Sequence, residues 1–158
     1  MAEIVQLLVS AHRRYAGRPT TDVAPPPDEL VDRVELRAGL GIVGDRYFNR
    51  PAHRDAGVTI MAAESLSPFG AAGLAQTRRN ILVRGVDVDG GRGRTLVLDS
   101  GDGPVRLRLN NPARPCRWMD VALGPGAWKG LQGRGGMRCT PLDDGVLRVG
   151  PAVTSWAD

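Results

Sequence analysis

A cysteine flanked by arginines is the first feature of this sequence that could do chemistry. The segment NNPARPCRWMD, residues 110–120, places Cys116 behind a proline, with Arg114 and Arg117 close to it in the chain. Cations beside a thiol stabilise the thiolate, which is the reactive form. A downward shift of one pKa unit would raise the thiolate fraction of such a group at neutral pH from a few per cent to roughly a quarter. The alternative is packing, since free cysteine is among the most buried residue types.

Two arginines and an asparagine precede an apolar run in TRRNIL, residues 77–82. At the start of a strand, Arg78, Arg79 and Asn80 could point into a cleft. There they would offer forked donors to a phosphate, together with an amide. The alternative is a solvated loop.

Glycines mark two further candidate segments. In GLGIVGDRYF, residues 39–48, three glycines precede Asp45 and Arg46, so the backbone could approach a ligand closely. A tight turn with a structural Asp–Arg pair is the alternative. In GRGGMRC, residues 133–139, a glycine-rich turn leads into a strand in which we expect Cys139 to face the core.

Common catalytic templates are missing from the sequence. It contains no GxSxG, HExxH, Walker or CxxC motif, and its histidines and cysteines lack the spacing of zinc ligands. We therefore expect no metal site built from protein side chains alone.

Composition favours one domain spanning residues 1–158, large enough to bury a core without disulfides. Of the 21 basic residues only Lys129 is lysine. Arginine suits phosphate and carboxylate recognition, although a G+C-rich genome would produce the same bias. The basic residues are scattered and aromatic residues make up 4% of the chain, which argues against a nucleic-acid surface.

Location is suggested by the first residues. Glu3 lies where a signal peptide would carry positive charge, and no apolar run approaches the roughly 20 residues of a membrane span. We expect a cytoplasmic protein with free cysteines and no membrane partner.

The elements that must position these residues are mostly short strands. We expect strands over residues 4–10, 30–37, 57–62 and 80–89, hairpins over 95–110 and 137–150, a helix within 62–75, and short helical turns over 118–124 and 125–131. The proline segment APPPDE, residues 24–29, is expected to join two strands. Many short strands separated by glycine and proline predict a mostly β fold, a barrel or a sandwich, with a few short helices.

Taken in order, four of these segments resemble the MOSC domain, the family named after the C-terminal domain of molybdenum cofactor sulfurases. They are GLGIVGDRY, RRNILVRGVDVD, NPARPCRWMD and GRGGMRCTPLDDGVLRVGP, and they run from about Gly39 to Pro151. The resemblance implies a MOSC-like β-barrel and gives Cys116 the position of the family's cysteine. It also suggests that Arg79 and Asn80 lie at a ligand pocket and that Gly44 and Asp45 belong to the family's glycine–aspartate loop.

The function implied by this resemblance is sulfur handling. Cys116 would take sulfane sulfur from a separate cysteine desulfurase and pass it, as a persulfide, to a molybdopterin-type or other small anionic ligand. Arg79 and Arg117 would hold the anion and Asn80 would orient it, with Asp45 and Arg46 also at the ligand. One alternative is a molybdenum-cofactor-dependent reductase, with Cys116 on the metal, or a cysteine-dependent small-molecule transferase. Another is a non-catalytic carrier of a pterin or phosphate.

Overall fold

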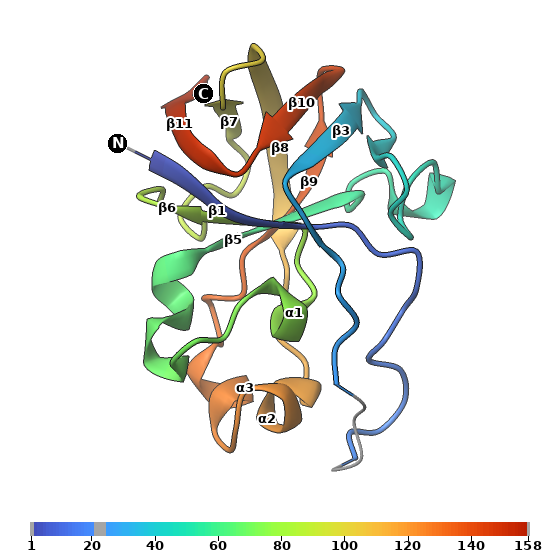
Figure 1. Ribbon diagram of the computed structural model, residues 1–158, viewed down its shortest axis with the longest axis vertical. Helices are drawn as coiled ribbons and strands as arrows, with labels where there is room; N and C mark the ends of the chain where they lie inside the picture. Colours follow the sequence, from blue (N-terminus) through green and yellow to red (C-terminus); the bar gives the residue numbers. More distant parts are fainter. Residues whose placement is uncertain (1, 21–24, 158) are drawn as a thin grey trace.

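The protein is a β-barrel with most of its short helices gathered at one end (Figure 1). The computed structural model describes residues 2–20 and 25–157. Its strands are β1 (Ala2–Leu8), β2 (Leu30–Val31), β3 (Arg33–Arg37), β4 (Gly41–Ile42), β5 (Val58–Ala62), β6 (Ile81–Arg84), β7 (Thr95–Asp99), β8 (Pro104–Pro112), β9 (Met137–Pro141), β10 (Gly145–Arg148) and β11 (Gly150–Trp156). Its helices are the 3-10 helices η1 (Pro51–His53) and η2 (Ala63–Phe69) and the α-helices α1 (Leu74–Thr77), α2 (Trp118–Ala122) and α3 (Ala127–Gly130).

The larger sheet closes on itself. Its strands follow the order β11-β7-β8-β9-β5-β6-β1-β2, and β1 also pairs with β11, so every strand except β2 lies in a closed ring. Strands β5 and β6 are parallel, with Ile60 opposite Ile81. The second sheet, β10-β3-β4, packs its apolar side chains into the same core.

Alternating side chains explain the clearest hairpin. In β8, Val105, Leu107 and Leu109 are buried while Arg106 and Arg108 are exposed, because successive side chains point to opposite faces of a strand. β8 pairs with β7 as expected for residues 95–110. Cys139 of β9 is fully buried in the core, also as expected. The mostly β barrel predicted from the sequence is confirmed.

Four expected elements differ in the structure. The strand expected over residues 30–37 is divided into β2, which pairs with β1 in the larger sheet, and β3, which pairs with β10 and β4. Residues 137–150 do not form a hairpin, because β9 already has β5 and β8 on its two edges, so β10 pairs with β3 instead. The expected helix over residues 62–75 is divided into η2 and α1, which Gly70 separates with a φ of 66°. The strand expected to reach residue 89 stops at Arg84, before Gly85 takes a φ of 84°.

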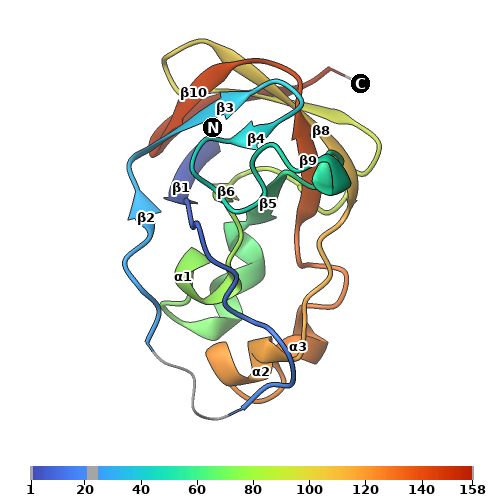
Figure 2. The same ribbon diagram turned by 90° about the vertical axis from the view of Figure 1, so that its right-hand side faces the viewer.

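The helices build a second apolar cluster at the end of the barrel. Leu66 of η2, Leu74 of α1, Met119 of α2 and Leu131 pack together there. Residues 9–20, which follow β1, run beside this end (Figure 2), and the Trp118 indole N–H donates to the carbonyl of Gly17 at 3.1 Å. Of the expected linker APPPDE, residue 24 lies outside the described residues, and residues 25–29 form no regular element before β2.

Candidate functional site

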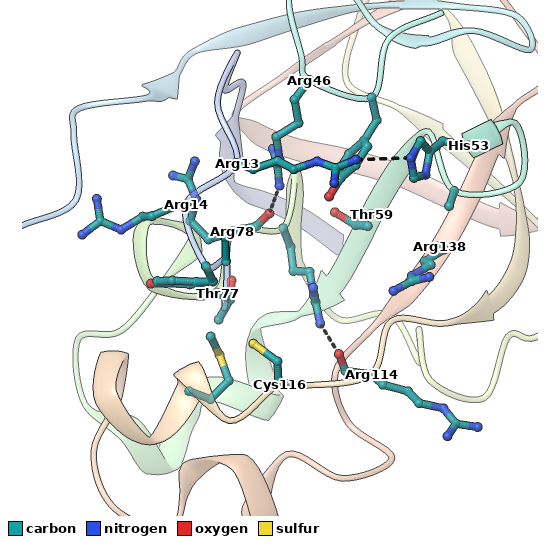
Figure 3. Close-up of a pocket in the computed structure, with 16 residues that line it drawn as sticks. Arg13, Arg14, Arg46, His53, Thr59, Thr77, Arg78, Arg114, Cys116 and Arg138 are labelled. Carbon is teal, nitrogen blue, oxygen red and sulfur yellow. Dashed lines mark hydrogen bonds between the residues drawn. The ribbon is translucent and has the colours of Figure 1, made fainter. Parts of the chain in front are cut away.

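A cavity of about 400 Å³ lies between the barrel and the helices. Its lining joins the connection after β1, the loop after β4, the segment before β6, and the loop that carries Cys116 (Figure 3). Arginines dominate the lining: Arg13, Arg14, Arg46, Arg78, Arg79, Arg114 and Arg138. Among the described residues, no aspartate or glutamate lines it. Such a cavity attracts anions.

Asp45 lies directly behind the cavity wall and orders one side of it. Its side chain is fully buried, and Oδ1 accepts hydrogen bonds from the Ser10 backbone N–H and from Arg46 Nη1, both at 3.1 Å. Arg46 also donates to the backbone carbonyl of Arg78 at 2.9 Å. The expected Asp–Arg pair is therefore present, with the arginine at the cavity and the carboxylate behind it.

Asn80 is fully buried and links three segments of the barrel. Its Oδ1 accepts from the Thr59 backbone N–H at 3.0 Å, and its Nδ2 donates to the Leu8 carbonyl and to Asp45 Oδ1, both at 3.1 Å. Since both ends of this amide are occupied, Asn80 holds the cavity wall and does not line the cavity.

Arg78 ends α1 in a left-handed conformation, with a φ of 64°, and its backbone N–H bonds to Leu74. Its guanidinium pairs with Glu29 at 2.6 Å and donates to Ser10 Oγ at 2.8 Å. Burial acts to raise the pKa of Glu29, but hydrogen bonds from Ser10 and Arg78 outweigh it and hold that pKa below its usual value. Arg78 is thus a neutralised part of the wall.

Arg79 is held by backbone carbonyls and by no carboxylate within the described residues. Its Nε donates to Gly135 at 3.0 Å, and its Nη2 donates to Ala113 at 2.9 Å and to Arg114 at 3.3 Å. The glycine-rich turn can approach this closely because Gly135 has no Cβ; a Cβ at this position would collide with the Ala113 carbonyl. The GRGG segment therefore serves to fix Arg79 beside the loop that carries Cys116.

The charge of Arg79 is only partly compensated. Burial and the nearby charge of Arg138 lower the pKa of Arg79 to about 10, and a negative charge on Cys116 acts in the opposite direction. An anion in the cavity would therefore be drawn to Arg79. A thiolate at position 116 lies close enough to share this attraction.

Cys116 is a free, exposed thiol, and its sulfur points toward the interior of the cavity (Figure 3). It lies just before α2, whose first turn is closed by a hydrogen bond from the Met119 N–H to the Cys116 carbonyl at 3.0 Å. The side chain of Arg114 extends away from the sulfur. Arg117 does not line the cavity, because its guanidinium stacks over the Trp128 ring, 4.3 Å from the centroid.

Of the six residues assigned to catalysis or ligand binding from the sequence, three line the cavity: Arg46, Arg79 and Cys116. Asp45 and Asn80 support the wall from behind, and Arg117 lies outside. Arg114 and Arg117, which flank Cys116 in the sequence, do not converge on its sulfur, since neighbouring side chains on a turn diverge.

Several cavity residues were missed in the sequence: Arg13, Arg14, Tyr15, His53, Thr77 and Arg138. The run HRRY, residues 12–15, was the available signal, since it clusters basic and aromatic residues directly after the first strand. Arg138 lies in the candidate segment GRGGMRC but was not itself assigned to the site, and nothing local marked His53; both reach the cavity only through the closure of the barrel.

Comparison with known proteins gives the fold alone. No protein-family model matches the sequence, and no curated protein matches it significantly. The YuaD protein from Bacillus subtilis has a similar structure, with a TM-score of 0.72 at 16% identity over 99% of this chain and 96% of that one. YiiM from Escherichia coli gives a TM-score of 0.61 at 16% identity, covering 98% of this chain and 70% of YiiM. YiiM from Geobacillus stearothermophilus gives 0.60 at 18% identity, covering 98% and 75%.

These neighbours support a MOSC-like β-barrel fold, in agreement with the order of the motifs. No helix in the described part of the chain is long and apolar enough to cross a membrane. Nor do residues 2–20 and 25–157 contain a group of three or more His, Cys, Asp and Glu side chains able to hold a metal ion.

Proposed function

We propose that this protein handles sulfur: Cys116 accepts sulfane sulfur and passes it to a small anionic ligand held by the cavity arginines. One observation carries the proposal, namely an exposed thiol that faces a cavity lined by arginines and, among the described residues, by no carboxylate. A thiol used only for packing would be buried, as Cys139 is. A site used only for anion binding would not need a nucleophile at its centre.

The chemistry needs no external oxidant or reductant. The Cys116 thiolate attacks the outer sulfur of a donor persulfide, R–S–SH. The donor's S–S bond breaks, R–S⁻ leaves, and Cys116–S–SH forms. An acceptor nucleophile then attacks the outer sulfur of Cys116 and restores the thiolate. Arg79 lines the same cavity as Cys116 and carries no carboxylate partner among the described residues, so its charge is available to an anionic donor or acceptor.

A molybdopterin-type cofactor is compatible with the residues present. The cavity volume lies within the range of about 300–1,000 Å³ that small-molecule sites occupy. Arg46, Arg79 and Arg138 would hold the phosphate of such a group, and Cys116 would offer a thiolate ligand to its metal. When bound, the group would supply a metal centre able to accept sulfur.

Sulfur loading tests the proposal directly. Reduced protein is incubated with a cysteine desulfurase and cysteine, and intact and peptide masses are recorded. We expect the gain of one sulfur atom on Cys116, its loss on treatment with dithiothreitol, and no gain in Cys116→Ser. Cys139→Ser is the matched control and should load normally. Absence of loading in wild-type protein, or loading retained in Cys116→Ser, would overturn the proposal.

A further inference from the structure

The same cavity points to the class of molecule that supplies the sulfur. We propose that the protein also takes sulfur from a small oxyanion whose sulfane sulfur is bonded to a sulfonate, of which thiosulfate is the simplest. The inference rests on the proposed persulfide at Cys116. It adds a small-molecule donor, bound in the arginine cavity, to the protein donor considered above.

The charge around Cys116 carries this inference. Attack of a thiolate on thiosulfate, a dianion, concentrates negative charge in the transition state, which a cationic and partly water-excluded site stabilises strongly. Arg79 and Arg138 meet this need, because neither has a carboxylate partner among the described residues. Transfer from an alkyl persulfide to the thiolate would gain less from such a lining.

Thr77 supplies an independent sign of a bound oxyanion. It lines the cavity and is 4% exposed, and its hydroxyl has no hydrogen-bond partner within the described residues. An unpaired buried hydroxyl costs free energy, so it is expected to have a partner when the protein is at work. Thr77 ends α1 at the edge of the cavity, and its hydroxyl is not used by a backbone carbonyl of that helix. There it would donate to a sulfonate oxygen.

The transfer is balanced without a further reactant. The Cys116 thiolate attacks the outer sulfur of thiosulfate, the S–S bond of thiosulfate breaks with its electron pair on the sulfonate, and sulfite leaves. Cys116 then carries a persulfide. Cyanide can attack the outer sulfur of this persulfide, giving thiocyanate and returning the thiolate.

The test measures sulfite release and protein mass with thiosulfate as the probe. We expect one sulfite for each protein, one sulfur added to Cys116, and catalytic thiocyanate formation when cyanide is present. Arg138→Gln should slow loading about tenfold or more. Arg33→Gln removes a charge of the same sign outside the cavity and should load at the wild-type rate. Added salt should slow loading of the wild type by screening the arginines.

Thr77 separates ligand binding from folding. Thr77→Val keeps the shape of the side chain and removes an unpaired hydroxyl, so its melting temperature should equal or exceed that of the wild type while loading slows. Thr77→Ser should restore the rate. A loss of stability in Thr77→Val with an unchanged loading rate would show a structural hydroxyl and contradict the assignment.

The two proposals fail in different ways. If a cysteine desulfurase loads Cys116 and thiosulfate does not, the small-donor inference is overturned and the sulfur-handling proposal stands. If neither donor loads Cys116, both are overturned. Equal loading by thiosulfate in the wild type, Arg138→Gln and Thr77→Val would also overturn the inference, because it would show unassisted thiol chemistry.

Discussion

Replacement of Asn80 by alanine should destabilise the protein far more than an ordinary polar substitution. The change removes the acceptor of the Thr59 backbone N–H and a donor to the Leu8 carbonyl, both in the buried wall of the cavity. Asp45 keeps its bonds from Ser10 and Arg46, so it remains paired. Two buried backbone groups left without partners, at about 1–3 kcal/mol each, predict a loss of about 2–6 kcal/mol.

Urea denaturation with linear extrapolation would measure this loss. The matched control is Asn110→Ala, which removes an amide that donates to the Asp55 carbonyl and to Thr140 Oγ1 in a more exposed setting. Water can replace these two bonds, so we expect a loss under about 1 kcal/mol. If Asn80→Ala lowered the free energy of unfolding as little as the control does, the reasoning would be refuted, because water would then be replacing the lost hydrogen bonds in the cavity wall.

Further predictions concern the cysteines and two aspartates. Burial raises the pKa of Cys139 far above its usual value, so iodoacetamide at neutral pH should label Cys116 first by peptide mapping, and equal rates would contradict the site. Burial also raises the pKa of Asp89. The ionised carboxylate therefore lowers the stability of the protein at neutral pH, and stability recovers as pH falls through the folded pKa of Asp89. Asp89→Asn should raise the melting temperature at pH 7. A hydrogen bond and the charge of Arg106 lower the pKa of Asp143, so Asp143 contributes stability that is lost as pH falls through its folded pKa. Asp143→Asn should lower the melting temperature at pH 7, and shifts of the same sign in both variants would refute the assignment.

The β-barrel could be predicted from the sequence because the patterns that mark its strands and turns are local. Alternation in residues 105–109 gave β8, and the turn residues between Asp99 and Pro104 gave the β7–β8 hairpin. Which distant strands pair with one another could not be predicted from the sequence. The turn Asp143-Asp144-Gly145 is typical of a hairpin, yet β9 does not pair with β10. Both edges of β9 are already hydrogen-bonded, one to β5 and one to β8, and these pairings follow from the closed ring of strands.

For the candidate site, the sequence indicated which residue types could carry chemistry, and the tertiary structure decided which of them meet. Cys116 and Arg79 could be chosen by type and by their neighbours in the chain, since a thiol near cations and a forked donor before a strand are local features. Asn80 follows Arg79 directly, yet it points into the wall while Arg79 reaches the cavity, because successive side chains at a strand point opposite ways. Arg117 follows Cys116 directly, yet its guanidinium stacks on Trp128, because successive side chains at the start of a helix point in different directions. Arg13 and Arg138 come from opposite ends of the chain, and their charges add to one field only because the barrel closes around a common cavity.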